Sequence, residues 1–220
     1  QVEDEIEILG SRSNFIQVVK ELGANVKIMA LGNIINSEVY SNPPIKVNFI
    51  AADSTIYNAD YSFFVEFSSG NTFGFTEDEN VPSKIYSYGN GISTPIGNMV
   101  ITPNLKDPKS LIGKRYQISI SPVEKVAISF KTGVNISIST EFSNILDVSM
   151  TSAIPKKAKD VIDKLIEVYN RNAIEDKKRI ADTTSDFINN RIQLISGTLT
   201  TVDKDAQELL TEKGMTGSGI

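Results

Sequence analysis

The fold is decided by residues 155–213, PKKAKDVIDKLIEVYNRNAIEDKKRIADTTSDFINNRIQLISGTLTTVDKDAQELLTEK, which we predict to form one long helix. From Ile188 onward, apolar residues recur in alternating steps of four and three: Ile188, Ile192, Ile195, Leu199, Val202, Ala206 and Leu209. This is the spacing of a coiled-coil stripe, and these seven residues are named the seam. We expect its six large members to contact a copy of the same chain or a second helix.

The first third of the helix carries a broader apolar face, formed by Ala158, Val161, Ile162, Leu165, Ile166, Val168 and Tyr169. A face of this width suits packing on a sheet better than a narrow two-helix contact. At 1.5 Å per residue the whole run would reach roughly 90 Å, which exceeds the diameter of a domain built from the remaining residues. We therefore expect residues 155–170 to pack on the domain and the distal part to extend away from it.

The seam has an alternative interpretation, in which the helix folds back onto its own domain. Against this, the polar stretch 170–178 separates the two apolar faces by several turns. Burying the six large seam residues would contribute at most about 10 to 15 kcal/mol, which is a large apolar surface to leave in water. Self-association or an absent second helix is the interpretation that we favour.

Composition excludes several classes of function. The net charge is -5 and the pI about 4.9, so no basic face exists for phosphate contacts and a nucleic-acid partner is not expected. Histidine, the commonest general base and metal ligand, is absent, and so is cysteine. The longest uncharged run, 85–105, is interrupted by glycine and proline, so no membrane span is predicted. The start at Gln1 has the character of a cut piece, and residues 214–220 are expected to form a flexible tail.

The remaining sequence predicts an α+β fold. Residues 2–22 have helical spacing, with a possible break near residues 11–13, and residues 123–133 predict a short helix opened by a capping box at Ser121 and Glu124. Alternating residues predict strands between 26 and 150, most clearly a hairpin of 61–67 with 72–75. We expect a mixed sheet with both helices packed on one side, a base domain over 1–154, an extended helix over 155–213 and the tail.

No catalytic, cofactor-binding or metal-binding residues are predicted. Gly113-Lys114 lacks the rest of a P-loop, and Gly89-Asn90-Gly91 is followed by no helix, so it indicates a turn. The acidic run 77–79 is expected to be a solvated loop, because adjacent carboxylates do not space themselves around a calcium ion. Four tyrosines could stack on sugar rings, although core or rim packing is the expected role: Tyr57, Tyr61, Tyr86 and Tyr88.

Several stretches resemble a known family. Residues 3–13, EDEIEILGSRS, with 18–22, VVKEL, are similar to the opening of the chain-length determinant (Wzz-type) domain of bacterial polysaccharide co-polymerases. Residues 144–149, NILDVS, and the helix through Tyr169-Asn170 to 187–189 resemble its strand and long helix. Residues 38–40, EVY, with 42–47, NPPIKV, are similar to members joined to a cytoplasmic tyrosine autokinase, as in exopolysaccharide systems of Bacteroides-like bacteria.

The resemblance implies a periplasmic domain of an inner-membrane protein, held by membrane segments that flank this stretch. Such proteins form homo-oligomers and set the length of a capsule, exopolysaccharide or O-antigen chain, together with a polymerase or export machinery. The family offers no catalytic residue to assign, and any kinase activity would lie outside this segment. The alternative is a glycan-binding or adhesion-type module with an oligomerising helix, in which polysaccharide is a direct partner.

Overall fold

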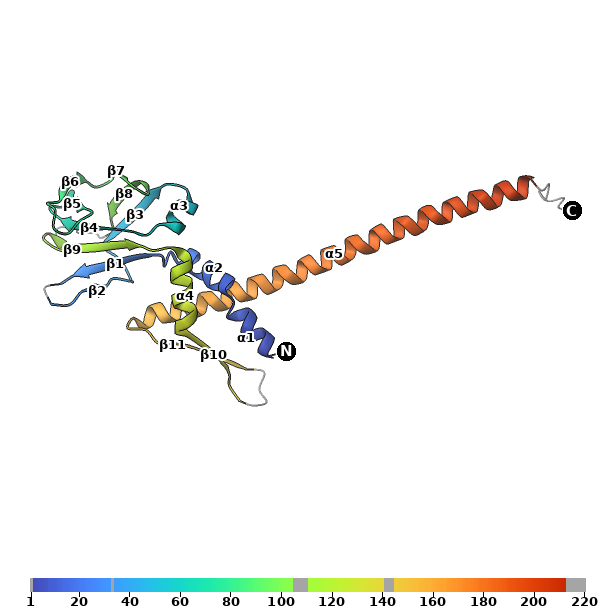
Figure 1. The fold of residues 1–220 in the computed structure, drawn as a ribbon, viewed down its shortest axis with the longest axis horizontal. Coiled ribbons are helices and arrows are strands. Elements are labelled where there is room, and N and C mark those ends of the chain that lie inside the picture. Colours follow the sequence, from blue (N-terminus) through green and yellow to red (C-terminus); the bar gives the residue numbers. More distant parts are fainter. Residues whose placement is uncertain (1, 33, 105–110, 141–144, 213–220) are drawn as a thin grey trace. The chain divides into compact units, whose positions relative to one another are not determined.

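The computed structural model describes residues 2–32, 34–104, 111–140 and 145–212. The chain divides into two compact units, Gln1–Tyr169 and Asn170–Ile220. The α+β class is confirmed, with antiparallel sheets and helices in the first unit and a long C-terminal helix that begins there (Figure 1).

The N-terminal helical stretch is two helices, α1 (Val2–Leu9) and α2 (Arg12–Leu22). The break that the sequence allowed lies at Gly10 and Ser11, and the Ser11 hydroxyl accepts a hydrogen bond from the backbone N–H of Asn14 at 3.4 Å. Gly23 ends α2 in the left-handed conformation, with φ of 60°, which glycine adopts without the steric cost that a Cβ would add. The two turns therefore set the direction of the chain into the first strand.

Six strands form the larger sheet, and every neighbouring pair in it is antiparallel. Their order across the sheet is β2 (Ser37–Glu38), β1 (Val26–Leu31), β9 (Arg115–Ile120), β4 (Tyr61–Phe67), β5 (Thr72–Thr76) and β6 (Lys84–Ser87). The predicted hairpin of β4 and β5 is confirmed. The late strand β9 lies between β1 and β4, which joins segments far apart in the chain.

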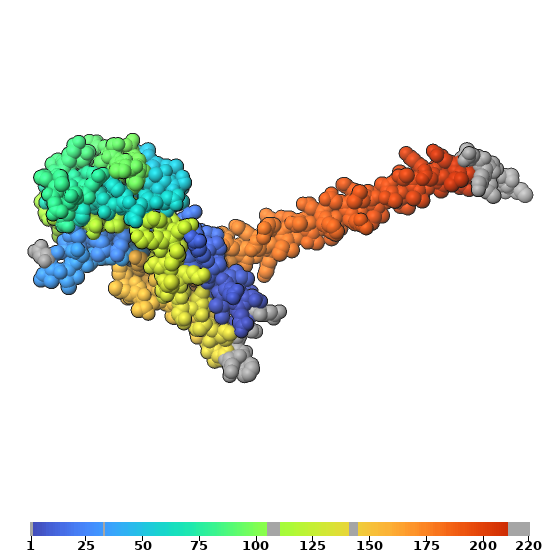
Figure 2. Space-filling model, in the orientation of Figure 1, coloured from blue at the N-terminus to red at the C-terminus, as the bar shows by residue number. Residues whose placement is uncertain are grey.

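A three-stranded sheet packs with the larger sheet around the first apolar core. It consists of β3 (Ile45–Ile50), β8 (Gly97–Pro103) and β7 (Gly91–Thr94), in that order across the sheet. The sequence did not predict β7. A helix that the sequence did not predict, α3 (Asp53–Asn58), follows β3 and adds Ile56 to this core. The core contains phenylalanines from β4 and β5 and aliphatic residues from β3, β8 and β9. In the space-filling view, the residues from β3 to β8, coloured cyan to green, form a closely packed mass (Figure 2).

Helix α4 (Val123–Gly133) confirms the predicted short helix, but the predicted capping box is wrong. The N-cap residue is Pro122, and no side chain caps the helix. Ser121 lies one residue too early for the role, and its backbone N–H donates to the Asn25 carbonyl at 2.9 Å. The hairpin of β10 (Val134–Ile138) and β11 (Leu146–Met150) follows, as predicted, and the turn at 141–144 lies outside the described residues.

Helix α5 (Pro155–Glu212) is the long predicted helix, and Lys213 and the tail lie outside the described residues. Before it, the Ser152 hydroxyl accepts a hydrogen bond from the Ile154 backbone N–H at 3.1 Å. The first turns of α5 build the second apolar core with α1, α2 and α4, whose buried residues are Leu9, Phe15, Val18, Val19, Val123, Ala127, Phe130, Val161, Leu165 and Val168. The broad apolar face therefore packs within the first unit.

The expectation of one mixed sheet is corrected in its details. The paired strands are divided among three sheets, and all the pairings that the structure describes are antiparallel. Alternation marks a strand but does not identify its partner, because pairing depends on contacts across long loops. The N-terminal helices and α4 pack against each other and α5 to form the second core, and the two larger sheets enclose the first core.

Replacement of Leu165 by alanine tests the packing of α5 in the first unit. Leu165 is fully buried, so its truncation should lower the free energy of unfolding by about 2 to 5 kcal/mol. Ile166 is the matched control, since it is the next residue and 41% exposed, and its replacement by alanine should cost less than about 1 kcal/mol. Urea unfolding followed by circular dichroism measures both. Equal losses for the two variants would contradict this packing.

Candidate functional site

The candidate site is the seam, and its six large members lie exposed on α5. Every side chain from Ile174 to Leu210 is exposed in the single chain. The six predicted residues are each 50 to 60% exposed: Ile188, Ile192, Ile195, Leu199, Val202 and Leu209. Since the helix is continuous through them, their spacing places all six along one side of it. Local backbone structure thus brings the predicted site residues together on one stripe.

The seam divides into two rows that each repeat every seven residues. Ile188, Ile195, Val202 and Leu209 form one row, and Ile192, Leu199 and Ala206 form the other. Knobs-into-holes packing requires a seven-residue repeat, and the first row maintains this repeat over three successive heptads. The middle of the stripe also borders a shallow depression lined by Arg191, Leu194, Ile195, Thr198, Leu199 and Val202. Four of these six residues are aliphatic, and Arg191 and Thr198 are the polar ones.

A further apolar row beside the seam was missed by the sequence reasoning. Ile180, Phe187 and Leu194 are seven residues apart and 63 to 69% exposed. Phe187 and Leu194 each directly precede a seam residue and so lie about 100° around the helix from it. The seven-residue spacing was the signal that could have identified this row. The exposed apolar surface is therefore broader than a two-helix contact would cover.

The sequence of α5 around the seam is a poor helix former by itself. Gly197 and the threonines at 198, 200 and 201 have lower helix propensity than alanine. The three threonine hydroxyls donate to carbonyls four residues earlier, at 2.8 to 3.0 Å. Such bonds satisfy the hydroxyls but add little to helix stability. A helix of this composition gains most of its stability from packing of its apolar side.

The start of α5 is held to the larger sheet by a polar network in the first unit. Lys157 donates to the Glu38 carboxylate of β2 at 2.5 Å, and the Tyr40 hydroxyl donates to Asp160 at 3.0 Å. Lys156 also donates to Asp160 at 3.1 Å. Burial, and then the hydrogen bond to the Asp160 carboxylate, raise the pKa of Tyr40 to about 12. The hydrogen bond from Lys156 is the main cause that lowers the pKa of Asp160.

The acidic run and the tyrosines have structural roles. Glu77 accepts a hydrogen bond from the Tyr61 hydroxyl at 2.5 Å, Glu79 pairs with Arg115 at 3.5 Å, and the Asp78 carboxylate accepts from the Asn80 backbone N–H. All four tyrosine rings named above pack against the two cores. Among the described residues, no group of three or more acidic side chains is arranged to hold a metal ion.

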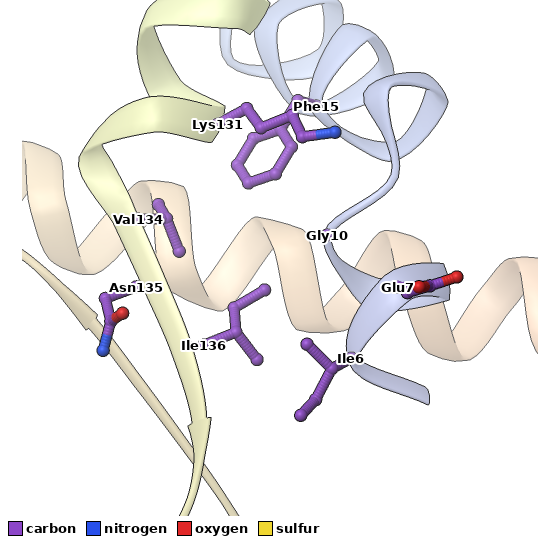
Figure 3. A pocket seen from close by; sticks show the side chains of 8 residues that line it. All are labelled: Ile6, Glu7, Gly10, Phe15, Lys131, Val134, Asn135 and Ile136. Atoms are coloured by element: carbon purple, nitrogen blue, oxygen red, sulfur yellow. The ribbon is translucent and has the colours of Figure 1, made fainter. Parts of the chain in front are cut away.

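A groove also lies between α1, α2, the end of α4 and β10 in the first unit. Apolar side chains line it from both sides, with Ile6 on α1 facing Ile136 on β10 and the ring of Phe15 at one end (Figure 3). Glu7, Lys131 and Asn135 contribute polar groups to the lining (Figure 3). The lining offers no pairing of a nucleophile with a base, so its residues suit apolar packing better than a reaction.

None of the helices in the described ranges combines the length and the apolar character that crossing a bilayer requires.

No protein-family model matches the chain, and no curated protein matches it. Among solved structures it is similar to Xanthomonas campestris FlgL in two crystal forms. One alignment has 14% identity and a TM-score of 0.30 over 83% of this chain and 54% of that one. The other has 15% identity and a TM-score of 0.26 over 66% and 41%. The chain thus spans about half the length of these structures, and TM-scores this low do not indicate a common fold.

A peptide of residues 170–212 tests whether the seam stabilises its helix by association. We expect low helicity in dilute solution and a rise with concentration, because packing must compensate for the low propensity of residues 197–201. The peptide with Ile195→Glu and Leu199→Glu should lose the concentration dependence, whereas Gln193→Glu and Thr200→Glu, on the opposite side, should retain it. Circular dichroism measures the helicity. Equal helicity at all concentrations in the unaltered peptide would contradict association.

The raised pKa of Tyr40 predicts how stability depends on alkaline pH. Since its pKa is 10.0 when unperturbed and about 12 in the folded chain, Tyr40 contributes stability below pH 10.0 that is lost as the pH rises to about 12. The free energy of unfolding should therefore decline less steeply over this interval in Tyr40→Phe than in the unaltered protein. Urea unfolding at a series of pH values measures the slopes, and identical slopes would contradict the prediction.

Proposed function

We propose that this chain is a self-associating periplasmic domain of an inner-membrane protein of the chain-length determinant type. In this proposal it regulates the length or export of a capsule, exopolysaccharide or O-antigen chain and performs no reaction in this segment. Its partners are further copies of itself and the polysaccharide polymerase or export machinery. Any tyrosine kinase domain would belong to another part of the gene product.

The observation that carries the proposal is the exposure of the seam. Six large aliphatic side chains at coiled-coil spacing are 50 to 60% exposed, and Phe187 and Leu194 extend the apolar surface. Removing such side chains from water is favourable by about 1.5 to 3 kcal/mol for each one fully buried. A continuous apolar stripe on a regular helix therefore supports association with another helix more directly than it supports substrate binding.

The α+β first unit is compatible with the same role. Its two cores occupy most of the apolar residues of the described ranges up to Tyr169, and its polar clusters form ion pairs and hydrogen bonds between secondary-structure elements. The sequence resemblance supplies the periplasmic setting and the link to polysaccharide length. The exposed seam supplies the physical means by which copies would associate.

The decisive experiment uses the whole gene product in its own host. Ile195→Glu with Leu199→Glu should abolish oligomers detected by chemical cross-linking and should change the length distribution of the polysaccharide on gels. Gln193→Glu with Thr200→Glu introduces the same charge into the same turns away from the seam and should leave both unchanged. Unchanged oligomers and unchanged polysaccharide lengths in the seam variant would refute the proposed function. Protein abundance is measured in each strain as the control for folding.

A further inference from the structure

A cleft in the first unit contains convergent charged and polar groups that the seam does not use. Its space is about 640 Å³, within the range of small-ligand sites. Five elements and a loop form its walls: β1, β2, α4, β11, the residues before α5, and the start of α5. We propose that this cleft binds a saccharide unit that carries a carboxylate, and the choice of a saccharide rests on the proposed function.

The charged groups of the cleft are two ammonium groups and one carboxylate. Lys157 donates to Glu38 at 2.5 Å, and the Lys27 Nζ lies 3.6 Å from the second Glu38 oxygen. The side chains of Glu38 and Lys157 are only 17% and 18% exposed, whereas that of Lys27 is 47% exposed. The Lys27 side chain therefore remains accessible to a ligand. Because Glu38 balances only one of the two lysine charges, one positive charge of the cleft is left unbalanced. A ligand carboxylate supplies the missing negative charge.

The neutral groups of the cleft suit a polyhydroxylated ligand. Ser129 of α4 and Thr151 after β11 place hydroxyl groups on the lining, and neither side chain makes a hydrogen bond to another described residue. Glu38 offers an acceptor beside the Lys157 donor, which is the combination that neighbouring sugar hydroxyls require. The partly buried Met150 contributes apolar surface against which the C–H groups of a sugar ring can pack. Charge, hydroxyls and apolar surface thus converge within one hollow.

This site differs from the one that the aromatic residues suggested. Tyr57, Tyr61, Tyr86 and Tyr88 are engaged in core packing. The cleft instead combines residues from 27 to 157, which only the folded sheet and helices bring together. Pairing of β1 with β2 places Lys27 and Glu38 on neighbouring strands, and the second core holds α4 and α5 across from them.

Titration of the isotope-labelled chain, followed by NMR, tests the proposal with two tetrasaccharides. One alternates glucuronate and N-acetylglucosamine, and the other contains N-acetylglucosamine alone. The acidic probe should shift resonances of Lys27, Ser129 and Thr151 in a saturable way, and the neutral probe should bind more weakly. Acetate at the same ionic strength separates a saccharide site from a simple anion site. Equal shifts with acetate, equal affinity for the neutral probe, or no saturable shift at millimolar saccharide would each overturn the proposal.

Matched lysine variants identify the cleft as the location of binding. Lys27→Gln should weaken the acidic probe roughly tenfold, the low end for a charge-assisted hydrogen bond. Lys125→Gln removes the same charge from an exposed site on α4, where Lys125 pairs with Asp60 at 3.7 Å, and should leave the affinity unchanged. Equal losses in both variants would overturn the assignment. Thermal unfolding of each variant confirms that the fold is retained.

The seam variant separates this proposal from the proposed function. The chain with Ile195→Glu and Leu199→Glu should bind the acidic probe with unaltered affinity, because the cleft is formed within the first unit. Loss of oligomers in the host together with no saccharide binding would refute the cleft alone. Saccharide binding that requires an intact seam would refute the assignment of binding to the cleft.

Discussion

The rest of the structure depends on how α5 removes its apolar side chains from water. Over its first turns, Val161, Leu165 and Val168 are fully buried against α1, α2 and α4. Farther along the same helix, the aliphatic residues of the seam are half exposed. The physical requirement is the same in both parts, since apolar area is favourably removed from water. The first part meets it within its own unit, and the second part does not meet it in the single chain.

Polar contacts also hold the start of α5 within the first unit. Lys157 and Asp160 are tied to β2 and the segment after it through Glu38 and Tyr40. Lys164 pairs with Glu21 of α2 at 3.5 Å, and the Tyr169 hydroxyl donates to Glu5 of α1. These partly exposed interactions each contribute modestly to stability, but together they fix which face of the helix meets the second core. The apolar periodicity of a single helix is thereby divided between two environments.

Two kinds of surface remain after the cores have formed. The seam is apolar, regular and continuous, which are properties of a surface for another helix. The cleft of Lys27, Glu38 and Lys157 is concave and polar, which are properties of a surface for a small, charged and hydroxylated ligand. The two surfaces belong to different units of the chain and share no residue. A domain that acts on the length of a polymer would use both, one to assemble copies and one to contact the polymer.

The sequence predicted the elements that depend on local pattern. The hairpin of β4 with β5 follows from alternation around Ser69-Gly70-Asn71, and α4 follows from apolar spacing that ends at Gly133. The extent of α5 and the six large seam residues follow from the same rule, because a repeat of 3.6 residues per turn places them on one side of any helix. The weak segments β7 and α3 were missed because short elements carry too few residues for a period to be evident.

The sequence by itself determined where most of the helices and strands form, α3 and β7 excepted, and which residues line the seam. These properties are set by residues within a few positions of one another. Only the tertiary structure decided that the strands form three sheets, that β9 lies between β1 and β4, and that Lys27, Glu38 and Lys157 meet in one cleft. The physical reason is that strand pairing and core packing depend on contacts between residues far apart in the chain, up to the 164 positions that separate Glu5 and Tyr169 (169 − 5), and no local period records them.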